Sequence, residues 1–307
     1  MTVLLAVLAA ILLLLTIAAA YFFRYTFTRT EKKEPWAREL ENTVLKDRGF
    51  FEQRGRELLE LRSRDGLKLK AWFYDRGSKT TVILCHGYRG GPEELSGIAS
   101  YLYKKGMNIL LIYHRAHGLS EGKSFTMGGK EKLDAVDWAR EIARRRPEGK
   151  IVLFGWSMGG NTVMGAVGEE LPGNVVCAVE DCGYENLRDQ LLFSCQGSMP
   201  RLPAKRLFIG LLDLHCRLFH GFSLNEPRAA ALARCGIPML FIHGAKDTVV
   251  PFENLKRCYG ACASKKLRSA YARAGHVGAC GSETERYFGE LCAFINSSVK
   301  QEEKHGS

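Results

Sequence analysis

The sequence predicts an α/β protein in which a mostly parallel β-sheet is covered by helices on both faces. Short apolar runs of strand length alternate with helix-like stretches along most of the chain, an order that is typical of β-α-β units. One of these runs leads through Gly155-Trp156-Ser157-Met158-Gly159 directly into a helix-like stretch. The chain has 307 residues, of which 46% are hydrophobic, and this is enough for one such domain with insertions.

The chain opens with an apolar segment that is long enough to cross a lipid bilayer. Residues Val3 to Phe23 carry no charge, and about 20 apolar residues suffice for a transmembrane helix. We therefore predict a single-pass membrane anchor over residues 1–24. A cleaved signal peptide is an alternative, with Ala18-Ala19-Ala20 as its cleavage site, although no basic residues precede the apolar run. A buried core helix is the third interpretation.

The residues that follow the anchor predict its orientation. Aromatic residues end the span and basic residues come next: Tyr21, Phe22, Phe23, then Arg24, Arg29, Lys32 and Lys33. An excess of basic residues favours the cytoplasmic side. We therefore expect a protein of the cell membrane whose folded domain is cytoplasmic.

The cysteines and the net charge agree with this location. Ten cysteines are scattered without a C-x-x-C pair or a zinc spacing, and Cys85 and Cys177 lie in apolar runs where they fit as small buried side chains. An extracellular domain with some disulfides is the competing interpretation. The formal charge of +11 indicates either a solvated surface or attraction to anionic headgroups. No basic motif interleaved with aromatic residues points to nucleic acid.

Beyond the anchor, the sequence predicts a juxtamembrane linker over 25–55, a folded domain over 56–300 and a polar tail over 301–307. The domain begins with two alternating segments between Leu58 and Tyr74, joined at Asp65-Gly66, which is a strong hairpin signal. The predicted strands that follow are Thr81–Cys85, Ile109–Tyr113, Ile151–Phe154, Val175–Val179, Pro238–Ile242 and Leu267–Tyr271. The predicted helices are Pro92–Lys105, Lys130–Arg146, Asn161–Glu170 and Glu283–Ile295.

One long segment interrupts the alternation of strands and helices. This segment, from about residue 185 to about residue 235, is rich in Leu, Phe, Arg and His and includes Met199-Pro200 and Leu202-Pro203. We predict a helical cap inserted over the sheet, because such insertions often shape substrate pockets.

Ser157 is the predicted nucleophile. In the pattern G-x-S-x-G, placed between a strand and a helix, the serine occupies a sharp turn that exposes its hydroxyl, and the flanking positions take glycine because side chains there would collide. A serine hydroxyl is a poor nucleophile at neutral pH, so it needs an imidazole to take its proton and a carboxylate to orient that imidazole.

The acid and the base should follow the serine in that order along the chain. Asp247 comes just after a predicted strand, and His276 lies in a loop of small residues after the last one. Asp181, after the preceding strand, is the rival acid. The remaining histidines fit worse, because they lie in other loops, at a strand end, in the cap or in the tail: His86, His243, His215, His220 and His305.

Two backbone N–H groups are predicted to form an oxyanion hole. Met158 begins the helix after the nucleophile, and Tyr88 lies in the glycine-rich loop His86–Gly91 after an earlier strand. A phosphate-binding turn is disfavoured because this loop lacks the G-K-[ST] ending. We expect no cofactor and no metal, since the triad and the backbone amides supply the whole mechanism.

Together these motifs resemble the α/β-hydrolase fold family, and more narrowly its bacterial membrane-anchored hydrolases near the monoacylglycerol-lipase and serine-aminopeptidase-like branch. The matching stretches are Cys85–Tyr88, Arg115–Ser120, Gly155–Gly159, Ile242–Asp247 and Gly275-His276. Relatives often carry an Asp about two residues before the Arg-x-x-Gly-x-Ser stretch, whereas His114 directly precedes Arg115 here. That stretch is a structural turn, so Ser120 is not the nucleophile.

The resemblance implies a serine hydrolase that cleaves carboxylic esters through an acyl-enzyme on Ser157, and it says little about the substrate. The apolar cap and the anchor make lipid-like esters attractive, but packing of the cap helices onto the core also explains these apolar residues, so shorter esters are favoured. A peptidase of the same fold would need acidic groups for the substrate amine, and the cap offers Asp213 and Glu226 in an otherwise basic segment. A non-catalytic, membrane-anchored binding protein is a third alternative, although such proteins often lose a triad member.

Overall fold

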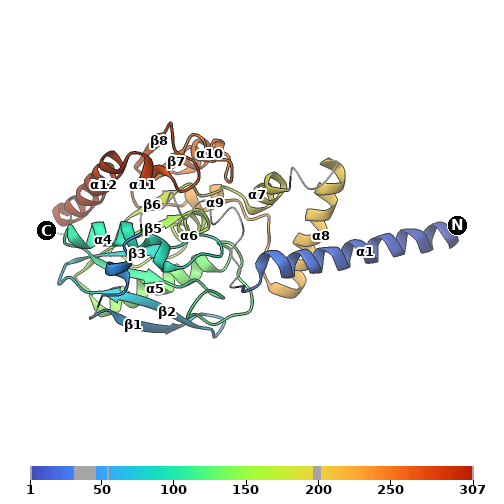
Figure 1. Ribbon diagram of the computed structural model, residues 1–307, viewed down its shortest axis with the longest axis horizontal. Coiled ribbons are helices and arrows are strands. Elements are labelled where there is room, and N and C mark those ends of the chain that lie inside the picture. Colours follow the sequence, from blue (N-terminus) through green and yellow to red (C-terminus); the bar gives the residue numbers. More distant parts are fainter. Residues whose placement is uncertain (1, 31–45, 54, 196–201, 306–307) are drawn as a thin grey trace. The chain divides into compact units, whose positions relative to one another are not determined.

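The computed structural model describes residues 2–30, 46–53, 55–195 and 202–305, and it divides the chain into two compact units (Figure 1). The first, which we call the cap unit, contains Met1–Thr28 and Asn186–Pro227. The second, which we call the sheet unit, contains Arg29–Glu185 and Arg228–Ser307. Each unit is described by itself below.

The sheet unit is built on one eight-stranded sheet. Its strands are β1 (Glu57–Arg62), β2 (Lys68–Tyr74), β3 (Thr80–Cys85), β4 (Asn108–Ile112), β5 (Lys150–Trp156), β6 (Val175–Asp181), β7 (Met239–Gly244) and β8 (Lys266–Tyr271). Their order across the sheet is β1-β2-β4-β3-β5-β6-β7-β8. β1 and β2 pair antiparallel with their neighbours, and β3 to β8 are parallel. The predicted mostly parallel sheet is thus confirmed.

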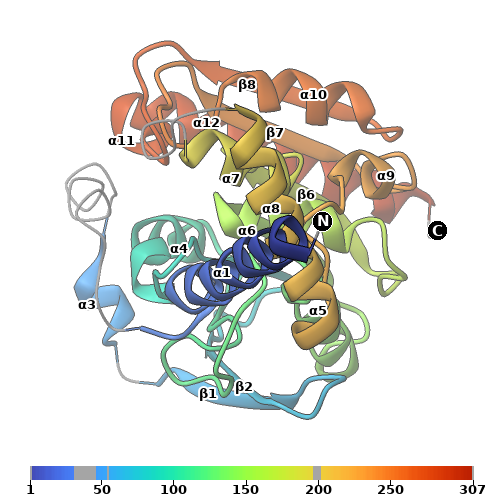
Figure 2. The same cartoon turned by 90° about the vertical axis from the view of Figure 1, so that its right-hand side faces the viewer.

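Helices cover both faces of this sheet (Figures 1 and 2). One face packs against α3 (Arg48–Phe51), α4 (Ser96–Lys104), α11 (Ala279–Ser282) and α12 (Thr284–His305), and a short 3₁₀ turn (Pro92–Leu95) leads into α4. The other packs against α5 (Glu131–Arg145), α6 (Met158–Ala166), α9 (Arg228–Leu232) and α10 (Glu253–Ala261). Alternate residues of a strand enter the two cores: in β5, Leu153 belongs to one and Phe154 to the other. The sheet is therefore buried on both sides, as its near-continuous apolar strands require.

The hairpin at the start of the domain forms where it was predicted. β1 and β2 pair from Glu57 opposite Phe73 to Arg62 opposite Lys68. Gly66 has φ +89°, a conformation that residues with a Cβ rarely adopt, and its N–H donates to the Ser63 carbonyl at 2.9 Å. The Asp65-Gly66 signal therefore marks the turn itself.

Two boundaries differ from those that the sequence predicts. α12 extends to His305, so residues 301–305 continue this helix where a polar tail was expected. The insertion in the fold is also shorter than 185–235, because residues 228–235, including α9, belong to the sheet unit.

The predicted linker over 25–55 is structured where it is described. Residues 31–45 and 54 lie outside the described residues. Asp47 caps α3 by accepting the Phe50 N–H at 2.8 Å, and its other oxygen accepts the Ser100 hydroxyl of α4 at 2.6 Å. Arg29, expected as a cation beside the membrane, donates to the carbonyls of Gly118 (2.6 Å) and Ser120 (3.1 Å). It therefore holds a loop of the sheet unit.

The cap unit contains α1 (Thr2–Phe27), α7 (Leu187–Ser194) and α8 (Leu202–His220). α1 is long and apolar enough to cross a membrane, a property that signal sequences share, and it runs three residues past the predicted anchor. Its C-terminal part packs on α8: the rings of Phe22 and Phe208 meet edge to face at 5.5 Å, and Phe23 stacks on His220 at 3.6 Å. The anchor and the cap, expected as separate parts, thus form one unit. Met199-Pro200 lies outside the described residues.

Candidate active site

Ser157 occupies a tight turn between β5 and α6. Its φ is +53°, a disfavoured conformation for a residue with a side chain. A Cβ at position 155 would lie 2.1 Å from the carbonyl oxygen of Gly159, and a Cβ at position 159 would lie 2.0 Å from that of Cys85. Both distances are far below van der Waals contact, so this turn requires glycine at both positions.

The structure brings Ser157, His276 and Asp247 together in one hydrogen-bonded chain, although 119 residues separate the first two. His276 Nε2 lies 2.9 Å from Ser157 Oγ, and His276 Nδ1 lies 2.7 Å from Asp247 Oδ2. Ser157 stays partly accessible, whereas the histidine and the aspartate are buried. Since a carboxylate accepts, Nδ1 carries the proton and Nε2 is left to accept the serine proton.

Asp247 is held in its ionised form by the groups around it. Its Oδ1 accepts the N–H groups of Val249 and Val250, both at 2.8 Å, and Oδ2 lies 3.3 Å from His243 Nε2. Burial alone would raise the pKa of this carboxyl, but the hydrogen bonds from His243 and His276 outweigh burial and hold the pKa well below its ordinary value. The carboxylate can therefore orient and stabilise an imidazolium.

Asp181, the rival acid, has a different environment. Its Oδ2 accepts the hydroxyl of Tyr287 at 2.8 Å, and no hydrogen bond joins it to His276 in the described part of the chain. Burial raises its pKa to about 6. Its backbone carbonyl accepts the Ser157 N–H at 2.8 Å. Asp181 therefore supports the turn through its main chain.

The two predicted oxyanion donors belong to the helix and the loop that adjoin Ser157. Met158 is the first residue of α6, so its N–H belongs to the positive end of that helix. The loop after β3 approaches the serine closely, because a Cβ at Gly87 would lie 3.7 Å from Ser157 Cβ. Tyr88 follows directly on this loop, and its neighbour Arg89 has φ +51°.

His86 and His243, which were set aside as bases, support the site. Nδ1 of His86 donates to the Gly87 carbonyl at 2.8 Å, while its Nε2 accepts the His114 N–H at 3.2 Å. His243 ends β7, and its Nε2 contacts both the Val250 carbonyl at 3.1 Å and Asp247. Sequence reasoning missed these roles, and the only signal was that each histidine ends a buried strand beside a site loop.

Glu180 is a second buried acid that sequence reasoning missed. It lies inside the sheet on β6, where Oε2 accepts the Gly183 N–H at 2.8 Å. Burial raises its pKa to about 8, against an opposing pull from His243. Glu180 is therefore protonated at neutral pH, so it adds no second negative charge beside Asp247.

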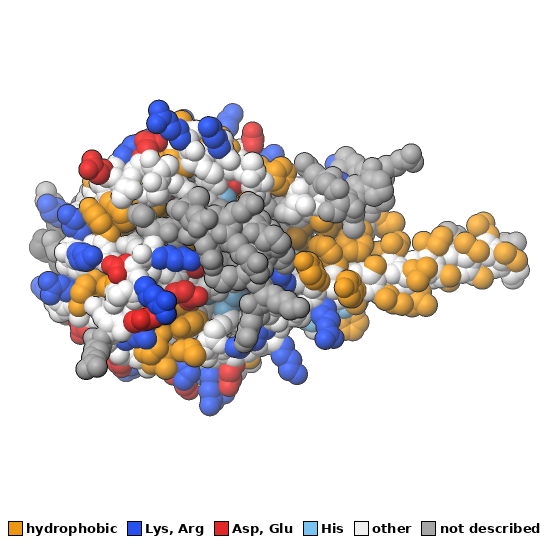
Figure 3. All heavy atoms as spheres, viewed as in Figure 1, with side chains coloured by type: hydrophobic (Ala, Val, Ile, Leu, Met, Phe, Trp, Pro, Cys, Tyr) orange, Lys and Arg blue, Asp and Glu red, His pale blue; other side chains and the backbone are white. Residues whose placement is uncertain are grey.

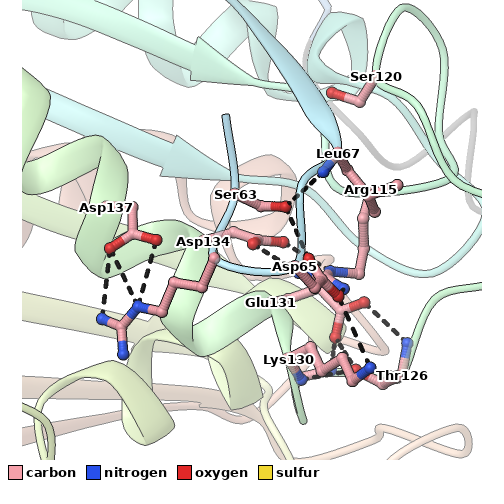
Figure 4. Close-up of polar contacts among 12 residues, drawn as sticks. Ser63, Asp65, Leu67, Arg115, Ser120, Thr126, Lys130, Glu131, Asp134 and Asp137 are labelled. Atoms are coloured by element: carbon pink, nitrogen blue, oxygen red, sulfur yellow. Dashed lines mark hydrogen bonds and ion pairs between the residues drawn. The ribbon is translucent and has the colours of Figure 1, made fainter. Parts of the chain in front are cut away.

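Arg115 follows His114, at the place where this sequence lacks the Asp that relatives often carry, and it lies in a cluster of polar contacts (Figure 4). Arg115 is buried and paired with Asp134 at 2.7 Å and with Asp65 at 2.7 Å. Burial lowers the pKa of His114 to about 3, and neither of its ring nitrogens has a hydrogen-bond partner among the described residues. The guanidinium is thus paired with carboxylates from two other segments of the chain. Ser120 donates to the Tyr113 carbonyl at 2.7 Å and is structural.

One group of potential metal ligands lies at the site. Among the described residues, ligand atoms of Cys182, Asp247 and His276 fall within 4.8 Å of one another. Both oxygens of Asp247 and both ring nitrogens of His276 already take part in hydrogen bonds. We therefore assign these residues to the hydrogen-bonded chain and not to a metal.

Comparison with known proteins shows what the chain is similar to. The family described as serine aminopeptidase, S33, matches residues 76–180. The protein YfhR of Salmonella typhimurium is 25% identical over 256 residues, covering 79% of this chain and 82% of its own. The α/β hydrolase domain-containing protein WAV2 of Arabidopsis thaliana is 27% identical, covering 69% and 68%. The esterase Pf2001 of Pyrococcus furiosus superposes with a TM-score of 0.66 at 21% identity, covering 89% and 98%.

The chain has the α/β-hydrolase fold, as predicted: an eight-stranded, mostly parallel sheet with a tight turn at Ser157 after β5, and the likeness to Pf2001 shows the same fold. The matching family and the relatives support an α/β-hydrolase family member. These likenesses also support an enzyme of the hydrolase class.

Proposed function

We propose that this α/β hydrolase is a serine esterase that cleaves carboxylic esters through an acyl-enzyme on Ser157. The observation that carries the proposal is the unbroken chain of hydrogen bonds from Ser157 Oγ through His276 to Asp247, at 2.9 and 2.7 Å. This arrangement makes a serine hydroxyl nucleophilic at neutral pH. The proposal assigns catalytic roles to these three residues and oxyanion-stabilising roles to the N–H groups of Tyr88 and Met158.

In the first half-reaction, Ser157 Oγ attacks the ester carbonyl carbon while its proton passes to His276 Nε2. The carbonyl oxygen becomes an oxyanion that accepts hydrogen bonds from the two backbone amides, each of which contributes on the order of a hundredfold or more in rate. When this intermediate collapses, the bond to the alcohol oxygen breaks. The departing oxygen takes the proton from His276, which leaves the acyl group on Ser157.

In the second half-reaction, water attacks the acyl carbon and gives its proton to His276 Nε2. The new intermediate expels Ser157 Oγ, which recovers the proton, and the carboxylic acid leaves. His276 is positively charged during both steps, and the ionised Asp247 stabilises that charge. The proposed residues thus supply the whole reaction.

An ester is favoured over a peptide because an acidic cap residue is already engaged. Asp213 accepts the Leu224 N–H at 2.6 Å and the Ser223 hydroxyl at 2.9 Å, and its other oxygen pairs with Arg217 at 2.8 Å. A peptidase would need such a carboxylate free for the substrate amine. The match to the serine aminopeptidase, S33, family keeps peptidase activity as the second candidate.

A fluorophosphonate probe tests the proposal, because it reacts covalently with an activated serine. We expect the wild-type chain to be labelled and Ser157→Ala to lose all labelling. The matched control is Ser297→Ala, an exposed serine on α12, which should be labelled like the wild type. Persistent labelling of Ser157→Ala would refute the assignment.

A panel of p-nitrophenyl esters of increasing acyl length, run beside aminoacyl amides, then separates short-chain esterase activity, lipid esterase activity and peptidase activity.

We also infer that α1 holds the enzyme at the cell membrane, with the sheet unit in the cytoplasm. The apolar span, with Arg24 at its C-terminal end, supports this interpretation. Protease added to intact cells should leave the sheet unit whole. Digestion of that unit before the cells are opened would place it outside.

A further inference from the structure

Helix α8 of the cap unit presents an apolar stripe that its packing leaves open. One side of the helix is buried, with Phe208, Ile209 and Leu212 no more than 7% exposed. The opposite side carries Leu207, Leu214 and Leu218, which are 57%, 50% and 67% exposed. Their spacing of seven and then four residues puts all three on one line along the helix. Exposed leucines in such a row mark an interaction surface.

Arginine residues flank this stripe. Arg206 and Arg217 are exposed and eleven residues apart, so they lie on one row next to the leucines. Arg217 also pairs with Asp213 at 2.8 Å. An apolar stripe edged by arginines is the pattern of a helix that lies in a membrane surface, since the leucines enter the acyl boundary and the guanidinium groups reach headgroup phosphates.

The position of α8 on α1 places the stripe at one end of the apolar span. Phe22, Phe23 and Phe27 of α1 contact α8 and the turn after it, and all three lie near the C-terminal end of α1. The described side chains of Val3 to Ile17 are almost all exposed. From Val3 to Phe23 the helix measures about 30 Å, the thickness of the hydrocarbon core. α8 therefore meets α1 at the depth where a bilayer would end.

The direction of α8 agrees with this position. Figures 1 and 2 show α8 running across the axis of α1 and not along it. If α1 crosses the bilayer, a helix that runs across it at its end lies in the plane of the membrane surface. Figure 3 shows hydrophobic side chains along α1 that continue onto the neighbouring part of the cap unit.

We propose that α8 is an interfacial helix, bound to the surface of the same bilayer that α1 crosses. Leu207, Leu214 and Leu218 enter the acyl boundary of the membrane, and Arg206 contacts lipid phosphates. The cap unit thus has two membrane contacts: a span and a helix lying flat at its end. The proposal rests on the geometry of the cap unit and is independent of the chemistry at Ser157.

Depth-dependent quenching in vesicles tests the proposal. The full chain is reconstituted into brominated phosphatidylcholine vesicles as three single variants: Leu214→Trp on the stripe, Leu12→Trp in α1 and Leu267→Trp on β8. Position 267 is the matched control, because it is 53% exposed and lies in the sheet unit. The wild-type emission of the four native tryptophans is subtracted.

We expect the emission from position 12 to be quenched most strongly. Position 214 should be quenched several-fold more than position 267 and most by bromines near the headgroups. Equal quenching at 214 and 267, with quenching retained at 12, would overturn the proposal while leaving α1 inserted. Emission from 214 that is blue-shifted but unquenched would also overturn it, because a protein partner then covers the stripe. Absence of quenching at 12 would overturn both contacts.

Discussion

At the level of single residues, Asp247 and Asp181 are both buried at the ends of neighbouring strands but meet different partners. Asp247 accepts two backbone N–H groups and faces two histidines. Asp181 accepts one tyrosine hydroxyl. Hydrogen-bond donors stabilise the charged form, and burial with few donors destabilises it. A pKa of about 6 still leaves Asp181 mostly ionised at neutral pH, so the hydrogen bond of Asp247 to His276 is what separates the two acids.

Replacing each aspartate by its amide separates the two roles. Asp247→Asn should lower kcat for an activated ester on the order of 10³- to 10⁴-fold, because an amide cannot fix the imidazole in the tautomer that accepts the serine proton. Asp181→Asn should lower it far less, since its side chain accepts the Tyr287 hydroxyl and, among the described residues, has no hydrogen bond to His276. Steady-state kinetics on p-nitrophenyl acetate measure both. An equal loss in the two variants would contradict the assignment of Asp247 as the acid.

The raised pKa of Glu180 makes the stability of the folded chain fall as the pH rises. Its pKa of about 8 lies above the ordinary value of 4.5, so the folded chain binds a proton that the unfolded chain releases between these values. Stability from this group is complete below pH 4.5 and is lost as the pH rises toward 8, by at most about 1.4 kcal/mol per pH unit. The titratable groups that interact with it include Asp181, Cys182, His243 and Cys258.

The variant Glu180→Gln should remove this slope, because glutamine stays neutral and can still accept the Gly183 N–H. Denaturant unfolding between pH 5 and pH 8 should show the variant gaining stability relative to the wild type as the pH rises. A difference that stays constant over this range would mean that Glu180 is already ionised in the folded chain.

At the level of elements, the sequence predicts the sheet well because each parallel strand is short, apolar and followed by a turn signal. The hairpin at Asp65-Gly66 and the glycine pattern around Ser157 are local, and local sterics decide them. The helix α12 was predicted too short, because its last two turns are polar and follow propensity, not an apolar pattern. Periodicity marks where a helix is buried and not where it ends.

Contacts between distant segments could not be predicted in the same way. Chain order does not separate Asp247 from Asp181, because both lie between Ser157 and His276, and the resemblance of the stretch Ile242–Asp247 supports the choice. Glu180 and His243 meet only because β6 and β7 are neighbours in the sheet. The sequence predicts α1 as a membrane anchor, yet no local pattern shows that Phe23 stacks on His220, 197 residues later. Such pairings depend on the tertiary fold, which a pattern along the chain does not contain.

At the level of the whole molecule, the cap unit has its own core, built from two segments far apart in the chain. Phe23 lies at the centre of this core, 4% exposed and in ring contact with Phe27, His215, His220 and Phe222. A unit held by so few side chains should open separately from the larger sheet unit.

Hydrogen exchange of the full chain in vesicles tests this independence. Phe23→Ala should speed exchange of the α8 amides on the order of 10²-fold, because truncation of a buried aromatic costs about 3 kcal/mol. The strands β5 to β7 should exchange as in the wild type. Leu12→Ala is the matched control, since Leu12 is in the same helix but 54% exposed. Faster exchange throughout the sheet would show that the two units unfold together.

The division of the cap unit between two distant segments has a consequence for synthesis. α1 leaves the ribosome first, and α8 follows about 175 residues later. At roughly 5–20 residues per second, α1 waits about 10–35 s for its partner. During this interval its aromatic face has no protein to cover it, and only lipid or a chaperone can shield it. The nascent chain therefore needs lipid or a chaperone to shield α1 before any of Ser157, Asp247 and His276 has been made.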